Sequence, residues 1–156
     1  MEVKLVSYTF NPVEKIEIAA STCYDSKPTK GAIMRHCYKS GHHSVLEFAD
    51  FHFKISGVSR ALTHQLVRHR MASFAQRSQR YCEEDGFNFV IPPTIQNNPE
   101  ALNVFNDVID VIKDGYGHLL EMGIPAEDAR FLLPNACASE INVKMNLREL
   151  IHFMNE

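Results

Sequence analysis

Residues 68–81 read Arg-His-Arg-Met-Ala-Ser-Phe-Ala-Gln-Arg-Ser-Gln-Arg-Tyr, and this stretch lies in the most positively charged part of the chain. Residues 51–82 contain six lysines and arginines and no aspartate or glutamate, which gives this block a charge of +6. Residues 1–50 are balanced in charge, and residues 83–156 carry a charge of −9. Five of the six basic residues are arginines, whose planar guanidinium groups suit bidentate binding of phosphate. The block therefore predicts a phosphate-bearing ligand.

Two kinds of phosphate-bearing ligand fit this basic block. In a noncatalytic RNA-binding module, the arginines would contact the RNA backbone while Phe74 or Tyr81 stacked on its bases. In an enzyme pocket, a nucleotide would also meet the uncharged polar side chains among the arginines, namely Gln65, Ser73, Gln76, Ser78 and Gln79. The net charge of the whole chain is −3, which disfavours general nucleic-acid binding. We therefore favour the nucleotide pocket, expect no nucleic-acid partner, and keep the RNA-binding module as the alternative.

The composition is that of a globular protein with a hydrophobic core. The chain has 156 residues, of which 45% are hydrophobic and 22% are charged. No stretch approaches the ~20 consecutive apolar residues that a membrane span needs, and the N-terminus lacks the pattern of a signal peptide, so we expect no membrane partner. The cysteines Cys23, Cys37, Cys82 and Cys137 form no CxxC pair, which argues against a disulfide framework and indicates a cytoplasmic protein.

A metal site is a weaker interpretation of the histidines. Its candidate ligands are His36, Cys37, His42, His43 and His52. Positions 36–37 and 42–43 are adjacent pairs, so their side chains point apart on a helix or strand and lack the spacing of metal ligands. We expect no metal site and interpret His36, His43, His52 and His118 as surface or core histidines.

The hydrophobic and turn patterns predict an α+β fold. Strands are expected at residues 3–10, 50–56, 87–91 and 138–145. Helices are expected at residues 12–23 (after an Asn11 cap), 29–39, 58–68, 99–121, 125–133 and from 146 onward, with a helical turn at 44–48 and a loop at 71–80. Because helices and strands alternate without the regular spacing of parallel βαβ units, we expect a single domain, residues 1–156, with an antiparallel or mixed sheet packed against helices.

Four motifs follow one another along the chain. Residues 68–81 contain Arg-His-Arg, then seven residues, then Ser78, with Arg-Tyr close behind. Residues 41–47 follow the pattern Gly-His-x-x-x-x-Glu, residues 129–134 the pattern Ala-Arg-x-x-Leu-Pro, and residues 146–148 the pattern Asn-x-Arg. In type, order and position, over about residues 41–153, these motifs resemble those of the flavin-dependent thymidylate synthases.

The resemblance implies an FAD-dependent methyltransferase that converts dUMP to dTMP. The carbon would come from methylenetetrahydrofolate, and NADPH would reduce the flavin, which delivers the hydride without a cysteine nucleophile. The resemblance also implies a homotetramer with active sites shared between subunits. The partners would therefore be dUMP, folate, NADPH and further copies of the chain.

The resemblance further implies two sets of binding residues. The dUMP set is Gln65, Arg68, Gln76, Ser78, Arg80 and Arg130. The FAD set is His42, Ser44, Glu47, Arg68, His69, Arg70, Asn146, Arg148 and His152, with His42 near the isoalloxazine ring.

Individual members of these sets have expected roles. Arg130 and Ser78 are the catalytic candidates. Arg130 is one because an arginine stabilises the negative charge that builds on the uracil ring. For Ser78 we favour substrate binding over nucleophilic attack, since no neighbouring base can be identified. His69 lies between two arginines in sequence, so we expect it to be neutral. The alternatives are an ion pair between Arg130 and Glu127, and phosphoryl transfer through His69.

The sequence departs from the family pattern in two places. Ala75-Gln76 stands where the family has Asn-Glu, so a carboxylate that would pair with an arginine is lost. Family members also continue into a segment with a further dUMP-binding arginine and an Ala-Gln-Trp-Glu stretch, whereas this sequence ends at Glu156 and has no Trp. We therefore expect a form that is C-terminally short relative to the family, which folds and binds flavin but turns over poorly.

Overall fold

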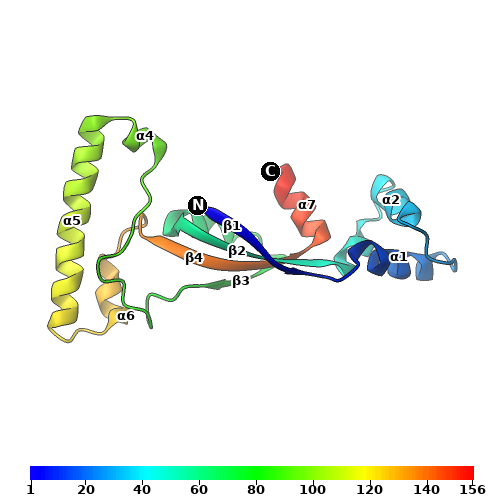
Figure 1. The fold of residues 1–156 in the computed structure, drawn as a ribbon, viewed down its shortest axis with the longest axis horizontal. Coiled ribbons are helices and arrows are strands. Elements are labelled where there is room, and N and C mark those ends of the chain that lie inside the picture. Colours follow the sequence, from blue (N-terminus) through cyan, green and yellow to red (C-terminus); the bar gives the residue numbers. More distant parts are fainter. The chain divides into compact units, whose positions relative to one another are not determined.

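The computed structural model describes residues 1–156 (Figure 1). Its strands are β1 (Glu2–Tyr8), β2 (Asp50–Ser59), β3 (Ala72–Gln76) and β4 (Ala138–Asn146). Its α-helices are α1 (Pro12–Cys23), α2 (Ala32–Lys39), α3 (Arg60–Leu66), α4 (Pro93–Gln96), α5 (Pro99–Glu121), α6 (Ala126–Ala129) and α7 (Leu147–Asn155). Two 3-10 helices, η1 (His43–Phe48) and η2 (Arg130–Leu132), complete the fold. No helix combines the length and the apolar character that crossing a membrane requires.

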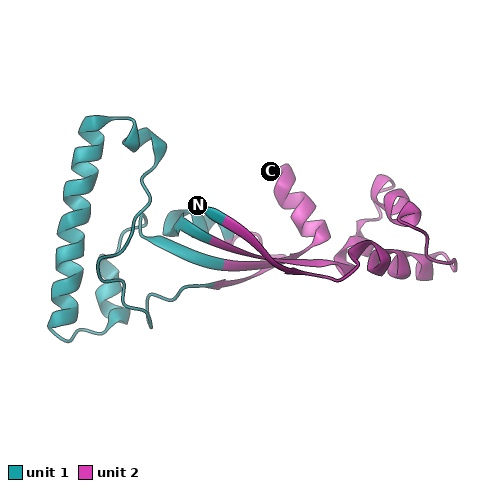
Figure 2. Cartoon of the chain, viewed as in Figure 1, with its two compact units in different colours: residues 1–2, 56–66, 76–141 teal, residues 3–55, 67–75, 142–156 magenta.

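The four strands form one antiparallel sheet in the order β1-β2-β4-β3. This confirms the predicted α+β class. The chain divides into two compact units, which Figure 2 shows in different colours. Unit 1 comprises residues 1–2, 56–66 and 76–141, and unit 2 comprises residues 3–55, 67–75 and 142–156, so every strand has residues in both units. The single domain over residues 1–156 stays a prediction.

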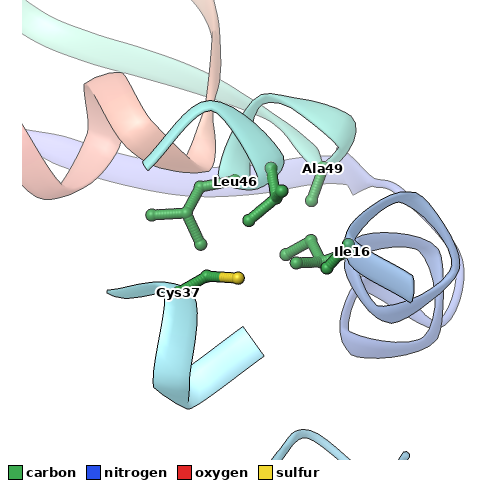
Figure 3. Close-up of a cluster of buried hydrophobic side chains, with 6 residues drawn as sticks. Ile16, Cys37, Leu46 and Ala49 are labelled. Carbon is green, nitrogen blue, oxygen red and sulfur yellow. The ribbon is translucent and has the colours of Figure 1, made fainter. Parts of the chain in front are cut away.

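Unit 2 has its hydrophobic core where α1, α2 and η1 meet. Figure 3 shows Ile16 of α1, Cys37 of α2 and Leu46 of η1 grouped with Ala49, and each of these side chains is at most 3% exposed. Partly buried side chains extend this cluster, namely Ile33, Met34, Phe51, Leu147 and Ile151. Burial of these apolar groups fixes the short connection between α2 and η1, which carries several of the candidate site residues.

A buried carboxylate joins α1 to the start of α2. Glu17 is 0% exposed and accepts hydrogen bonds from Thr29 N and Oγ1, both at 2.6 Å, and from Met34 N at 2.8 Å. Burial raises the pKa of Glu17, but these hydrogen bonds outweigh it and hold the pKa below its ordinary value of 4.5. Thr29 Oγ1 accepts from Ala32 N and Ile33 N, which explains why α2 begins at residue 32 and not at 29 as predicted.

The core of unit 1 is built on α5. Phe87, Ile109 and Cys137 are buried there, and Phe89, Phe105 and Ile112 pack against them. The positions 105, 109 and 112 are three and four residues apart, so their side chains share one face of the helix. This helix covers residues 99–121, as its apolar pattern predicted.

The helix start expected at Asn146 is confirmed, whereas the cap expected at Asn11 is not formed. Asn146 Oδ1 accepts from Glu149 N at 2.9 Å and begins α7 as predicted. Asn11 does not cap α1 with its side chain: its φ is +49, and its amide donates to the Glu14 carboxylate at 3.0 Å. The helical turn expected at 44–48 is a 3-10 helix over residues 43–48, whose cap position, residue 42, makes no side-chain cap bond.

Two strand predictions and one loop prediction were wrong. The strand expected to end at Gly57 continues to Ser59, because Gly57 adopts a φ of +67 within β2. The expected loop 71–80 contains β3, whose small and polar residues show no apolar period and become a strand by pairing with β4. In the expected strand 87–91, only Phe89 forms a bridge, to Cys137.

Candidate functional site

Two cavities in unit 2 collect most of the predicted cofactor residues. The larger measures about 650 Å3 and is lined by side chains of α2, η1 and α7, together with Met71 and Asn146. The smaller measures about 350 Å3 and shares His43 and Arg148 with the larger. Six of the nine residues of the predicted FAD set line one or both cavities: His42, Ser44, Glu47, Asn146, Arg148 and His152.

An ion pair joins the two walls of the larger cavity. Arg148 Nη1 donates to Glu47 Oε1 at 2.6 Å, and both side chains remain more than a third exposed. Arg148 stands in the first turn of α7 because Asn146 caps this helix. Glu47 stands in η1, which the hydrophobic core of unit 2 holds in place. The guanidinium is therefore fixed on one side by a carboxylate, and its remaining N–H groups are available to a ligand.

The turn after α2 presents His42 to the smaller cavity. Gly41 has a φ of +78, and its N–H donates to Tyr38 O at 3.3 Å, while His42 N donates to Cys37 O at 2.8 Å. These two bonds form a Schellman motif, which needs a left-handed residue at position 41 and therefore favours glycine. The Nδ1 atom of His42 lies 3.1 Å from the Tyr24 hydroxyl.

Acidic and aromatic groups surround His69. Its Nδ1 lies 3.5 Å from Glu149 Oε1, and its Nε2 lies 3.6 Å from Glu156 Oε2. Its ring packs edge-on against Phe153, with ring centroids 5.0 Å apart. The expectation of a neutral His69 rested on the arginines that flank it in the sequence, whereas the charged groups closest to its ring in space are the carboxylates of Glu149 and Glu156.

The arginines on either side of His69 are directed to solvent. Arg68 and Arg70 are both exposed, and neither forms an ion pair or a side-chain hydrogen bond. They are residues of unit 2, like the rest of the FAD set. Unpaired guanidinium groups are free to bind a phosphate group.

The remaining dUMP candidates belong to unit 1, and two of them meet at Glu127. Arg80 Nη2 pairs with Glu127 Oε2 at 3.3 Å, and Arg130 Nε donates to the main-chain oxygen of Glu127 at 3.0 Å. The alternative interpretation of Arg130, an ion pair with the Glu127 carboxylate, is therefore wrong, because Arg80 takes this carboxylate. Gln65 is exposed and makes no side-chain hydrogen bond.

Sequence comparison assigns the chain to a family. A model of the family described as "Thymidylate synthase complementing protein" matches residues 4–156. The chain belongs to this family. The flavin-dependent thymidylate synthase of Geobacter sulfurreducens is 42% identical over 98% of the chain and 72% of its own length, and that of Pyrococcus abyssi is 42% identical over 98% and 69%. These matches confirm the predicted resemblance and give no support to the RNA-binding alternative.

Solved structures show the same fold. A UMP/dUMP methylase from Streptomyces cacaoi bound with 5-Br dUMP has a TM-score of 0.79, at 24% identity over 97% of this chain and 75% of its own. Thymidylate synthase X from Helicobacter pylori, solved with FAD and dUMP, has a TM-score of 0.76, at 24% identity over 97% and 81%. At this identity the likeness concerns the fold alone.

The residues at the two cavities fit the flavin of a flavin-dependent thymidylate synthase. FAD has a negatively charged diphosphate and flat ring systems. Arg148 lines both cavities and has a guanidinium group that suits a diphosphate, whereas Arg68 and Arg70 line neither cavity. At the junction of the cavities, the stacked rings of Tyr38 and His43, with centroids 5.3 Å apart, supply a flat surface. The cavity volumes also fall in the range of small-molecule sites.

The departure of Gln76 from the family pattern has a structural consequence. Its Nε2 donates to Thr63 Oγ1 at 2.9 Å and to Ser139 Oγ at 3.2 Å. A glutamate at this position would have no hydrogen to donate to these oxygens. Thr63 is 0% exposed and its hydroxyl already donates to Arg60 O, so it relies on an amide at position 76 as its donor.

Ser78 has the surroundings of a binding residue. Its Oγ accepts a hydrogen bond from Arg80 N at 3.2 Å, and no histidine or carboxylate bonds to it. Neighbouring Arg77 pairs with Glu84 at 2.9 Å, and this hydrogen bond raises the pKa of Arg77. A serine nucleophile needs an adjacent base, so these contacts favour substrate binding for Ser78, as the sequence argument did.

Several site residues had no signal in the sequence analysis. Tyr24, Cys23 and Cys37 line the smaller cavity, and Tyr38, Met71, Glu149 and Ile151 line the larger. Tyr24 lies far from the family motifs, whereas Met71 lies inside the motif of residues 68–81 and Glu149 directly follows the Asn146-Leu-Arg motif, so both could have been included. Of the five metal candidates, Cys37, His42 and His43 line the smaller cavity, but no group of three or more His, Cys, Asp or Glu side chains is placed to hold a metal ion.

Proposed function

We propose that this chain is an FAD-dependent thymidylate synthase that methylates dUMP to dTMP, with methylenetetrahydrofolate as the carbon donor and NADPH as the reductant. The observation that carries the proposal is the convergence of six predicted FAD residues on two adjoining cavities of unit 2. The names of the relatives, and their identity over nearly the whole chain, support the same activity. When bound, FAD supplies the hydride that the reductive methylation needs.

The residues of unit 2 would hold the cofactor. Arg148, oriented by Glu47, would bind the diphosphate from the wall formed by α7. Arg68 and Arg70 would add charge to the same end of the ligand. His42 and Ser44 would hydrogen-bond the polar edge of the flavin in the smaller cavity. His152 and Asn146 would complete the lining of the larger one.

The residues of unit 1 would hold the nucleotide. Arg80 would leave Glu127 and bind the phosphate of dUMP, with Ser78 beside it, because an exposed ion pair is exchanged at little cost. Arg130 would stabilise the negative charge that develops on the uracil ring. Gln65 and Gln76 would provide further hydrogen bonds to the base or sugar, and the role of Arg68 of unit 2 in dUMP binding stays a prediction. The pairing of Gln76 with Thr63 supports an amide that is held rigidly for this purpose.

The working assembly would be a homotetramer with shared active sites, in the cytoplasm. The exposed apolar side chains of the edge strand β1, with Val3 56% and Tyr8 57% exposed, support burial against another copy. Four free cysteines, two of them buried, support a reducing compartment.

The first test is a visible absorption spectrum of the purified protein before and after addition of FAD. A flavin band that stays with the protein through a desalting column is expected. The second test is formation of dTMP from dUMP, methylenetetrahydrofolate and NADPH, followed by chromatography. Retained flavin without dTMP would leave the cofactor assignment standing and reject the reaction, whereas no retained flavin would reject both.

A further inference from the structure

The smaller cavity contains a hydrogen bond that none of the family motifs includes. Tyr24 directly follows α1, and its hydroxyl lies 3.1 Å from Nδ1 of His42, 18 positions away in the sequence. Both residues line the cavity of about 350 Å3, together with Cys37, Ser44 and Arg148. The contact therefore joins His42, a predicted flavin residue in the turn after α2, to the end of α1.

The direction of this hydrogen bond follows from the groups around the hydroxyl. The Cys37 thiol lies close to the Tyr24 hydroxyl, and its sulfur is only a weak acceptor, whereas an unprotonated imidazole nitrogen is a strong one. Between these two acceptors, His42 Nδ1 is the stronger partner for the hydroxyl hydrogen. The partial burial of the hydroxyl and its contact with the thiol raise the pKa of Tyr24, so the phenol keeps this hydrogen at neutral pH.

A donated hydrogen bond at Nδ1 determines the tautomer of His42. In a neutral imidazole one nitrogen accepts and the other carries the hydrogen, so a ring that accepts at Nδ1 carries its hydrogen on Nε2. The main chain of His42 is already held by its bond to Cys37 O at 2.8 Å. A ring held in this way, by its backbone and at Nδ1, presents an Nε2–H donor as its remaining polar group.

We propose that Tyr24 is a positioning residue, whose hydroxyl fixes His42 in the tautomer that donates from Nε2 to an acceptor atom of the flavin. The flavin as the ligand rests on the proposed function, whereas the tautomer of His42 does not depend on it. Tyr24 is 46% exposed and lies outside the hydrophobic cluster of unit 2, so its hydroxyl is not needed for folding. Its role is to order a side chain that would otherwise exchange between two tautomers.

The tautomer is tested by NMR on protein labelled with 15N at histidine. Long-range 1H–15N correlation spectra of the protein without FAD, near pH 8, are expected to show His42 with its hydrogen on Nε2. In Tyr24→Phe the His42 signals are expected to move toward the average of the two tautomers. Tyr8→Phe is the matched control, since Tyr8 is similarly exposed at 57% and its hydroxyl makes no hydrogen bond. A His42 ring protonated at Nδ1, or spectra unchanged in Tyr24→Phe, would overturn the proposal.

The link to the flavin is tested by FAD binding, measured from the quenching of flavin fluorescence. Tyr24→Phe is expected to raise the dissociation constant of FAD three- to tenfold, and to cause no further rise when His42 is already alanine. An equal loss in the His42→Ala background would mean that Tyr24 does not act through His42, and would overturn the inference. If the unaltered protein binds no FAD, the proposed function and the flavin part of this inference fail together, while the NMR result still decides the tautomer.

Discussion

Arg148 Nη1 lies 2.6 Å from Glu47 Oε1, which pairs two residues 101 positions apart in the sequence. The Arg148 side chain is 54% exposed and that of Glu47 is 38% exposed. Exposed ion pairs of this kind contribute only about 0–1 kcal/mol to stability. The short distance therefore suits a second purpose, which is to orient the guanidinium at the wall of the larger cavity.

Arg148→Ala is expected to weaken FAD binding without unfolding the protein. Hydrogen bonds to charged groups are worth about 1.5–3 kcal/mol, so the dissociation constant of FAD should rise roughly 10- to 100-fold. The free energy of unfolding should change by less than about 1 kcal/mol. The measurements are flavin fluorescence titration and urea unfolding. Lys144→Ala is the matched control, because Lys144 pairs with Asp50 at 3.3 Å with similar exposure and lines neither cavity.

Arg80→Ala is expected to weaken the binding of dUMP and to leave the binding of FAD nearly unchanged. Arg80 belongs to unit 1 and pairs with Glu127, whereas every cavity residue of the FAD set belongs to unit 2. Loss of the guanidinium should weaken dUMP binding at least about tenfold, since phosphate contacts of arginine are charge-assisted, and should change FAD binding less than about twofold. Isothermal titration with each ligand measures both constants. Equal losses for both ligands would contradict the assignment of Arg80 to the nucleotide.

The sequence was most informative where one element carries its own signals. Asn98 and Pro99 begin α5, and apolar residues at helical spacing continue it to Glu121, so both ends could be predicted. Asn146 likewise begins α7 and thereby places Arg148. The motif residues of the FAD set came from resemblance, and the structure brings six of them to two cavities although they are distant in sequence.

The sequence was least informative where a structure depends on a distant partner. The strand β3 has no apolar alternation and exists because it pairs with β4. The bond from Tyr24 to His42 depends on how α1 and the turn after α2 pack, which no local pattern encodes. The contact of His69 with Glu149 was missed for the same reason, since Glu149 belongs to α7 and lies 80 positions further along the sequence.

Glu17→Gln is expected to destabilise the protein and to flatten the dependence of its stability on pH. The carboxylate accepts three hydrogen bonds in the buried space between α1 and α2. In Glu17→Gln, the side-chain NH2 group would face an N–H or O–H group that donates, so at least one of these hydrogen bonds would be lost. We expect a loss of about 2 kcal/mol at pH 7, the scale of hydrogen bonds to a charged group. Glu14→Gln is the control, since Glu14 is exposed and accepts only from Asn11.

The sign of the pH effect follows from the pKa of Glu17. This pKa lies below the ordinary value of 4.5, so the folded protein releases the proton more readily than the unfolded chain. The stabilisation is therefore complete above about pH 5 and is lost as the pH falls through 4.5 and then through the lower pKa of the folded state. Urea unfolding between pH 7 and pH 3 should show a steeper loss for the unaltered protein than for Glu17→Gln. Parallel curves would contradict this role of Glu17.

Two glycine-to-alanine substitutions are expected to have opposite effects. Gly41 has a φ of +78 and open space around its missing Cβ, so Gly41→Ala should cost about 1–2 kcal/mol through backbone strain alone. Gly117 lies within α5, where an added Cβ would meet Asp85 Oδ1 at an ordinary distance of 3.5 Å, so Gly117→Ala should stabilise by about 0.5–1 kcal/mol. Thermal and urea unfolding measure both changes.

The same pair of variants distinguishes an effect on stability from an effect on FAD binding. Gly41→Ala should also weaken FAD binding several-fold, because the left-handed turn at Gly41 sets the position of His42 through the bond from His42 N to Cys37 O. Gly117→Ala should leave FAD binding unchanged, since α5 belongs to unit 1 and lines neither cavity. If Gly41→Ala lowered stability but bound FAD as tightly as the unaltered protein, the turn would serve only to end α2, and His42 would not be held by it for the cofactor.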